Sequence, residues 1–380
     1  MASEAPRPPS VFQRYLLPGL AFKAVVIGGG YATGRELAEF FIPSGPWGGI
    51  ASMLLAMALF SLVCIATFLF ARATATRDYQ SFFKALLGPG WIAFEGVYLL
   101  FIVLILAVYG AAAGTIGAAV FGLPVLAGTV ALAAGILLFV TFGNSSVEKL
   151  FEYVSYLLYA VYALFIVLAF TSFGDRIAAG FALDAPVQGW AAIRGVEYFG
   201  YNIIGAVVIL PVVRHLTSSR DAVIAGALCG PFTMLPALLF FIAMVAYYPE
   251  IGAEPLPSDF LLQRMNLPLF HLAFQLMIFS ALLESATSGV HAINERIDKA
   301  WQRHRGAPLS HRARLTIALL LLVFCMGLAS RFGLVELIAN GYRALAYLML
   351  AVFVLPLATI GVAKIIQRNR QGEAHVSTHA

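Results

Sequence analysis

Long apolar stretches, separated by short groups of charged, proline and glycine residues, recur along the whole chain. Residues 96–147 contain no Asp, Glu, Lys or Arg over 52 positions, which is enough for two membrane-spanning helices of roughly 20 residues each. Dividing the chain at its charge clusters and helix breakers predicts an all-α integral membrane protein with about ten helices. They are expected at residues 17–43, 47–71, 91–121, 124–142, 147–173, 190–213, 220–248, 267–295, 313–331 and 334–363.

The composition agrees with a membrane protein and argues against a soluble enzyme. Hydrophobic residues make up 61% of the 380 positions and charged residues only 11%, whereas a soluble domain has about a quarter of its residues charged. The spans contain no nucleophile–base pair and no histidine or cysteine spacing typical of a metal site, so we expect neither an enzyme nor a cofactor. We predict one transmembrane domain over residues 17–363, with tails at 1–16 and 364–380.

The distribution of basic residues predicts the orientation of the spans. With the N-terminus in the cytoplasm, 17 of the 24 lysines and arginines fall in cytoplasmic segments and four in external ones. Both termini are therefore expected in the cytoplasm, and the location expected is the inner (plasma) membrane of a bacterial-type cell. Because the net charge of +5 reflects this bias, we expect lipid as a partner and not nucleic acid.

Glycines interrupt two predicted spans at matching positions: three consecutive glycines in the first, and Gly200 in the sixth. The sixth span comes five positions after the first, so the two run in opposite directions, which points to an inverted-repeat transporter with repeats at about 17–173 and 190–363. Unwound backbone inside a bilayer is stable where it faces a cavity, ligand or ion. The expected substrate site comprises Gly28, Gly29, Gly30, Tyr31, Phe199, Gly200, Tyr201 and Asn202. The alternative is that the glycines only permit close helix packing, as Gly30-x-x-x-Gly34 would.

Two segments resemble a known family. The first-span stretch GGGYATGRELAEFF and the eighth-span stretch SGVHAINERID resemble the corresponding segments of the YkvI-like membrane proteins. That family looks like a divergent branch of the amino acid–polyamine–organocation superfamily. The resemblance implies the five-plus-five LeuT fold with helices 1 and 6 broken, and a secondary transporter that holds its substrate between the two breaks.

Glu284 is the most prominent charge inside a span, with Thr287 and Ser288 on the same helical face. Ionisable residues within membranes are costly and indicate function. In LeuT-like sodium symporters a Thr-Ser pair at this place meets carbonyls of the first helix, which the resemblance assigns here to Val26 and Gly29. We expect Glu284 either to bind sodium or to carry a proton; a structural pair with a basic residue is the alternative.

Arg35 follows the first-span glycines, and the resemblance implies that it acts as an outer gate that bridges to an acid. Glu197 lies at a similar depth in the sixth span, and Glu336 opens the tenth. Direct binding of a substrate carboxylate and a static ion pair are the alternatives for Arg35. Glu36 and Glu39 are expected to be solvated near the outer surface.

These observations predict a sodium- or proton-coupled symporter for a small amino acid or related zwitterion. An ion or small-solute channel, and a sensor or structural protein on a transporter-like fold, are the competing classes. Substrate identity, the choice between sodium and protons, the direction of transport and the oligomeric state do not follow from the sequence.

Overall fold

The structure is a computed structural model that describes residues 9–142 and 145–368, and every regular element in those ranges is a helix. Six helical stretches are long and apolar enough to cross a membrane, and Val125–Thr141 is a shorter apolar helix. The six are Pro46–Thr74, Tyr79–Phe121, Leu157–Ala182, Ser219–Val245, Pro268–Arg305 and His311–Arg368. The predicted tails fall mainly on residues 1–8 and 369–380, outside the described residues.

The N-terminal half contains an interrupted helix, four long helices (α4, α6, α7 and α8) and several short helices. These elements are η1 (Phe12–Leu16), α1 (Leu17–Val26), α2 (Gly29–Ala32), α3 (Arg35–Phe40), η2 (Ile42–Ser44), α4 (Pro46–Thr74), α5 (Tyr79–Leu87), η3 (Gly88–Gly90), α6 (Trp91–Phe121), α7 (Val125–Phe142) and α8 (Ser145–Ala182). The first predicted span is therefore present as three pieces, each too short to count among the long helices.

The C-terminal half begins with a second interrupted segment. Its elements are α9 (Ala191–Asn202), α10 (Gly205–Val208), η4 (Leu210–His215), α11 (Ser219–Val245), η5 (Glu250–Ala253), α12 (Pro257–Met265), α13 (Pro268–Arg305), α14 (His311–Glu336), η6 (Leu337–Tyr342), α15 (Arg343–Met349), η7 (Leu350–Val354) and η8 (Leu357–Gly361). The last long stretch bends at Gly333, where φ is +73°, between the two spans predicted there.

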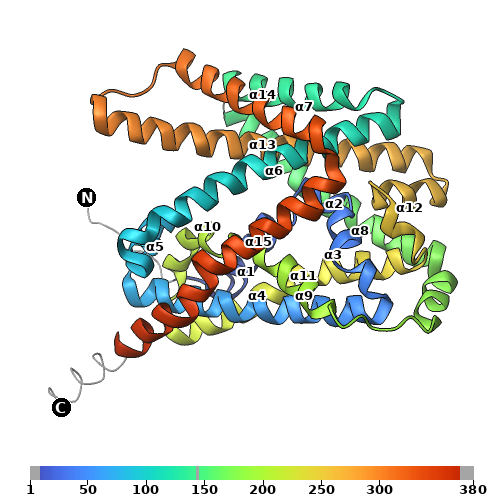
Figure 1. Cartoon of the computed structure of the whole chain (residues 1–380), viewed down its shortest axis with the longest axis horizontal. Coiled ribbons are helices and arrows are strands. Elements are labelled where there is room, and N and C mark those ends of the chain that lie inside the picture. Colours follow the sequence, from blue (N-terminus) through green and yellow to red (C-terminus); the bar gives the residue numbers. More distant parts are fainter. Residues whose placement is uncertain (1–8, 143–144, 369–380) are drawn as a thin grey trace.

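The helices form two packed groups. α4 packs against α9 and α11, and α11 also packs against α1; α6 packs against α7, α13 and α14. Figure 1 shows α7, α13 and α14 along one side of the molecule and α4, α9 and α11 along the opposite side, with α2, α3 and α15 between them. The interrupted segments thus lie where the two groups meet.

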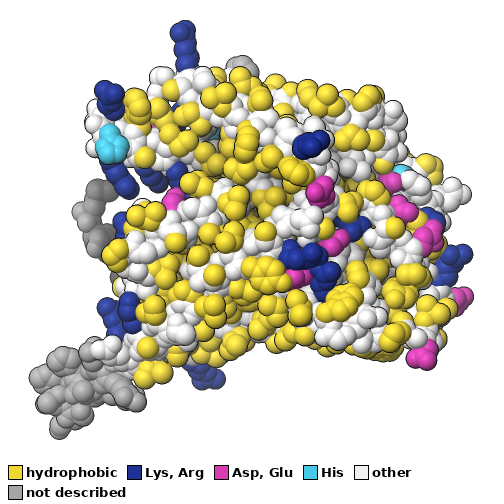
Figure 2. All heavy atoms as spheres, viewed as in Figure 1, with side chains coloured by type: hydrophobic (Ala, Val, Ile, Leu, Met, Phe, Trp, Pro, Cys, Tyr) yellow, Lys and Arg dark blue, Asp and Glu magenta, His cyan; other side chains and the backbone are white. Residues whose placement is uncertain are grey.

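The outer surface is that of a multi-pass membrane protein. Leucines such as Leu62, Leu269 and Leu320 have well over half of their surface exposed. On the face in Figure 2, hydrophobic side chains predominate, basic side chains gather towards the left end, and acidic and basic side chains mix towards the right. Apolar side chains around the middle and charges towards the ends fit a chain surrounded by lipid.

Candidate functional site

The first predicted span is interrupted at two places. α1 ends at Val26, Ile27 leaves the helical region with φ −89° and ψ 84°, and Gly28 is extended with φ −107° and ψ −171°. After the single turn of α2, Gly34 adopts φ +80° and leads into α3. An extended backbone suits any residue, whereas the left-handed conformation favours glycine. The backbone conformation at position 34 therefore requires glycine. At Gly28 the chain unwinds in a conformation that other residues could also adopt.

The second interruption lies between α9 and α10. Helical structure ends at Asn202 and resumes at Gly205, with Ile203 and Ile204 forming a turn between them. Asn202 Nδ2 donates a hydrogen bond to the carbonyl oxygen of Tyr198 at 3.1 Å. Such side-chain bonds give the backbone an alternative to the helical ladder and occur where helices end. The helix thus opens immediately after the four residues, 199–202, that the sequence assigned to the substrate site.

Two of those four residues pack against neighbouring helices. A Cβ atom on Gly200 would come within 2.9 Å of the Ala346 Cβ, so this glycine allows α9 to approach α15 closely. Phe199 is buried, with its ring 5.4 Å from that of Phe60 on α4. Gly200 therefore permits close packing between two helices, which was the alternative to an unwound backbone at this position.

A small cavity lies between the two interruptions. The volume that the centre of a water-sized sphere can occupy there is about 20 Å³, roughly the room that one water molecule needs. Of the residues predicted for the substrate site, five line it: Gly28, Gly30, Tyr31, Tyr201 and Asn202. The remaining lining residues are Val25, Val26, Glu36, Phe101, Ile105, Tyr109, Ile204 and Tyr342.

Glu36 lies in this cavity, and the expectation that it is solvated is wrong. Its residue surface is 5% exposed, and its Oε2 accepts a hydrogen bond of 2.5 Å from the Tyr201 hydroxyl. Its other oxygen, Oε1, lies 3.5 Å from where a Cβ atom on Gly30 would be. The bends at Gly28 and Gly34 reorient α3 relative to α1, so the depth of Glu36 does not follow from its distance along the chain.

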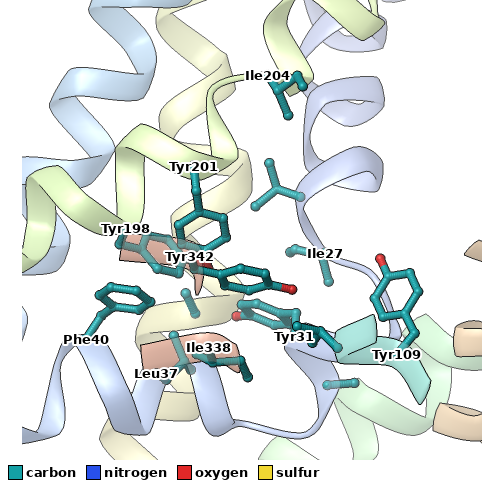
Figure 3. Close-up of a cluster of buried hydrophobic side chains, with 14 of the residues drawn as sticks. Ile27, Tyr31, Leu37, Phe40, Tyr109, Tyr198, Tyr201, Ile204, Ile338 and Tyr342 are labelled. Atoms are coloured by element: carbon teal, nitrogen blue, oxygen red, sulfur yellow. The ribbon is translucent and has the colours of Figure 1, made fainter. Parts of the chain in front are cut away.

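Tyrosines surround the carboxyl group of Glu36. The rings of Tyr201 and Tyr342 stack with their centroids 4.4 Å apart, and Tyr109 borders the cavity from α6. Figure 3 shows the rings of Tyr31, Tyr201 and Tyr342 grouped together, with Tyr109 to their right. Aromatic faces carry negative charge density. The arrangement suits a ligand with a positively charged group or hydrogen-bond donors.

Arg35 precedes the cavity residue Glu36 but pairs neither with it nor with Glu197. Its Nη1 donates to the carbonyl oxygens of Gly252 and Glu254 at 2.8 and 2.9 Å, and its Nη2 to Glu39 at 2.8 Å. The side chain is buried, with 5% of its surface exposed. Arg35 therefore joins α3 to the loop that contains η5. The side chain of Glu39, which is expected from the sequence to be solvated, is only 16% exposed and accepts the hydrogen bond from Arg35 Nη2.

Glu197 is bridged to the first span by Arg343, a residue outside the predicted site. Arg343 lies 3.4 Å from Glu197 and 3.4 Å from Glu39. Glu197 is buried and also accepts hydrogen bonds from Arg194 at 3.2 Å and Tyr347 at 2.7 Å. These charges form a network that joins α3, α9 and α15. Glu336 is exposed at the end of α14 and forms no salt bridge within residues 9–142 and 145–368.

The predicted ion site lies on α13, which packs against α2. Thr287 is buried and donates to the carbonyl oxygen of Leu283 at 2.7 Å, while Ser288 is exposed and donates to that of Glu284 at 3.1 Å. Ser285, which the sequence analysis did not select, has its Oγ 3.6 Å from the Cβ position of Gly28. The serine beside the interruption is therefore the one directly after Glu284, because it faces α2.

Glu284 is half-buried, on the side of α13 that faces α8. Lys23 on α1 places its Nζ 4.1 Å from the ring centroid of Tyr159 on α8, so a lysine, a tyrosine and a glutamate from three helices lie in this region. Among the described residues, no group of three or more His, Cys, Asp or Glu side chains could hold a metal ion.

A second ionic contact joins the segment before α1 to the start of α11. Arg14 forms two hydrogen bonds with Asp221 at the start of α11, one from Nε at 2.9 Å and one from Nη2 at 2.6 Å. Asp221 is buried and also accepts from Thr217. The hydrogen bonds to Asp221 raise the pKa of Arg14 above its ordinary value. The segment before α1 is thus held against α11 by a paired guanidinium and carboxylate.

Comparison with known proteins gives no match to a family model. The chain is 24% identical over 284 residues to the uncharacterized membrane protein YkvI of Bacillus subtilis (strain 168). The aligned region covers 73% of this chain and 80% of that protein. The expected resemblance to YkvI is confirmed as distant homology.

Two solved structures share the fold. MhsT in complex with L-phenylalanine is similar with a TM-score of 0.56 and 17% identity, covering 95% of this chain and 99% of that one. A mutant of the Eremococcus coleocola manganese transporter is similar with a TM-score of 0.51 and 17% identity, covering 93% and 81%. At these identities the likeness establishes a LeuT-like fold alone. The first neighbour binds L-phenylalanine, and the second is a manganese transporter.

Proposed function

We propose that this chain is a secondary active transporter that carries a small amino acid or related zwitterion across a membrane by alternating access. The observation that supports it most is the cavity between the two interruptions, because unwound backbone, one buried carboxyl group and several aromatic rings meet there. Free backbone groups at interrupted helices are the usual means by which such transporters hold charged cargo. A molecule with an amino group could use all three features.

The proposal includes ten spans in two inverted repeats, at about 17–173 and 190–363. The first interrupted segment and α4 would correspond to the second interrupted segment and α11. The close packing of α4 on α11 and α9, and of α1 on α11, supports a unit made of these spans that rocks against α6, α7, α13 and α14. The basic bias supports cytoplasmic termini in a bacterial-type inner membrane.

Two closing contacts support alternation between access from either side. The network of Arg35, Glu39, Arg343 and Glu197 joins α3, α9 and α15 after the first interruption, and the pair of Arg14 and Asp221 joins the segment before it to α11. Opening one contact while the other remains closed would expose the cavity to one side at a time. We assign to this network the gate role that sequence analysis predicts for Arg35, Glu197 and Glu336.

Coupling to sodium or protons is part of the proposal. Glu284, Thr287 and Ser288, with the carbonyls of Val26 and Gly29, remain the candidate ion site. Sodium prefers a shell of several oxygen atoms, which hydroxyl, carboxylate and backbone groups can supply. Loss of coupling and pH dependence in Glu284→Gln would identify the proton as the coupling ion of this site, whereas loss of sodium dependence in Thr287→Ala or Ser288→Ala would identify sodium.

The cargo is more consistent with an organic molecule than with a metal ion. One structural neighbour is described in complex with L-phenylalanine and another as a manganese transporter. The cavity lining contains one carboxylate and no His or Cys side chain. Manganese prefers several hard oxygen and nitrogen ligands together. A small molecule with an apolar part fits the aromatic lining better.

Metabolite exchange by the purified protein tests the proposal. Proteoliposomes would be given a labelled extract of small metabolites, with and without sodium and proton gradients, and the retained compounds identified by mass spectrometry. We expect saturable, gradient-dependent accumulation of amino acids or related compounds. Flux that rises linearly with concentration and only runs down gradients would indicate a channel. Absence of flux for every compound would favour a sensor or structural protein.

A further inference from the structure

Glu36 is the only charged side chain among the described residues that line the cavity. The titratable groups that face it are all tyrosines, from α2, α6, α9 and η6: Tyr31, Tyr109, Tyr198, Tyr201 and Tyr342. The adjacent Arg35 is directed elsewhere, to Glu39 and to the loop that contains η5. No salt bridge connects Glu36 to any basic side chain within the described part of the chain.

A carboxylate in this position lacks the cation that would stabilise its charge. Removing an ion from water costs several kcal/mol unless a partner of opposite charge is close. Tyr201 donates to Oε2, which leaves Oε1, near Gly30, as the oxygen that can hold a proton. Because no basic side chain among the described residues pairs with Glu36 in this buried site, the neutral acid is the form that the environment favours.

We infer that Glu36 binds the ammonium group of the cargo and that binding displaces the proton from Glu36. The surrounding tyrosine rings favour a cation beside the carboxylate. The balance is simple: the cargo arrives as a cation, Glu36 changes from acid to carboxylate, and one proton passes to water. This inference rests on the proposed function and specifies its cargo as a small primary amine, with or without a carboxylate.

Competition between cargo and a proton for Glu36 determines how their movements across the membrane are coupled. A proton and a cargo cation cannot occupy Glu36 together, so the site alternates between them as it changes sides. Cargo then moves in one direction while a proton moves in the other, which is exchange and not the symport that the sequence predicts. Lower pH on the cargo side should weaken cargo binding, because protonated Glu36 has no charge to offer.

Calorimetry on the purified full-length protein tests this inference. Binding of 2-phenylethylamine would be measured at one pH in two buffers of different ionisation enthalpy, which gives the number of protons released. We expect about one proton per bound amine, and an affinity that falls about tenfold for each unit by which pH is lowered while Glu36 is protonated. The matched anion, 3-phenylpropionate, should not bind measurably.

Variants identify the group that releases the proton. Glu36→Gln should bind the amine at least tenfold more weakly and release no proton. Tyr201→Phe keeps the carboxyl group and should still release one. Glu295→Gln, which alters an exposed carboxyl on α13, should behave as the wild type. If Glu36→Gln does not fold, the proton count of the wild type and of Tyr201→Phe still decides the matter.

The inference is overturned if the amine binds without proton release, if the anion binds as tightly, or if neither probe binds. Each of these results leaves metabolite exchange by proteoliposomes intact as a test of transport. A protein that exchanges other metabolites but fails these measurements is a transporter with a different cargo group. A protein that exchanges nothing contradicts the proposed function itself.

Discussion

Arg343 on α15 places its Nε 3.4 Å from Oε1 of Glu197 on α9. The same guanidinium lies 3.4 Å from Glu39 on α3, so one side chain connects three segments that are far apart in sequence. Because Glu197 is buried and Arg343 is only partly exposed, the contact is shielded from water more than a surface pair would be.

Replacing Arg343 by glutamine should loosen this end of the molecule. The ion pairs of a partly exposed arginine contribute about 1 kcal/mol, which corresponds to roughly a fivefold change in an opening equilibrium. The measurement is the rate at which a membrane-impermeant maleimide labels Asn202→Cys. The native cysteines Cys64, Cys229 and Cys325 are buried, which keeps the background low. An unchanged labelling rate in Arg343→Gln would show that Arg343 does not restrain opening.

Arg35 should not be replaceable by lysine. Arg35 Nη1 donates hydrogen bonds to the loop carbonyls of Gly252 and Glu254, and Nη2 donates to Glu39. A lysine has a single ammonium group on a flexible side chain and cannot make the same set of bonds. Arg35→Lys should cost about 2–3 kcal/mol and lower the thermal unfolding midpoint in detergent by several degrees. The control is Arg264→Lys, whose partner Glu250 is exposed and whose loss should cost less than about 1 kcal/mol. Equal midpoints for the two variants would contradict this.

Gly34→Ala should destabilise the protein through both backbone and packing. Gly34 has φ +80°, and an added Cβ would lie 2.7 Å from Cζ of Phe240. The left-handed conformation costs an alanine about 1–2 kcal/mol, and overpacking adds about 1–3 kcal/mol. Gly96→Ala, a helical glycine with open space around it, should instead be neutral or stabilising by up to about 1 kcal/mol. Thermal midpoints of the two variants provide the comparison.

Arg14→Gln should release the segment before α1. Asp221 would remain buried with only neutral partners, so the segment should detach from α11 more often. Amide hydrogen exchange in residues 10–16 should then become roughly tenfold faster than in the wild type. Arg312→Gln, on an exposed arginine of α14, is the control and should leave exchange in that segment unchanged. Equal exchange in all three proteins would mean that the pair contributes nothing to closure.

The positions of helices and of the first interruption follow from local sequence features. Apolar stretches of sufficient length lie where the long helices are, and the first of the three consecutive glycines, Gly28, is unwound together with Ile27. Glycine lowers the stability of a helix wherever it occurs, so a run of glycines is informative without any tertiary knowledge. Tyr201 and Asn202 were identified because they follow Gly200, although that glycine itself serves packing against Ala346.

The burial of Glu36 and the pairing of Arg343 depend on contacts between segments that are distant in sequence. The burial of Glu36 requires the bends at Gly28 and Gly34 and the hydroxyl of Tyr201 on another helix. The role of Arg343 requires α15 to lie against α9. Neither relationship has a signature in spacing along the chain, because both arise from the angle at which broken helices cross.

The central claim is that cargo occupies the space between the two interruptions, and Gly28→Ala tests it most directly. Gly28 is extended, a conformation that alanine adopts without strain, and an added Cβ would lie at ordinary contact distance, 3.4 Å from the Tyr109 hydroxyl and 3.6 Å from Ser285 Oγ.

The variant should therefore fold as well as the wild type while its methyl group occupies cargo space. Rates of metabolite exchange would be compared for wild-type, Gly28→Ala and Gly96→Ala proteins in proteoliposomes, with thermal midpoints measured on the same preparations. We predict at least a tenfold loss of exchange in Gly28→Ala alone, at an unchanged midpoint. Exchange by Gly28→Ala at the wild-type rate would place the cargo elsewhere and contradict the account.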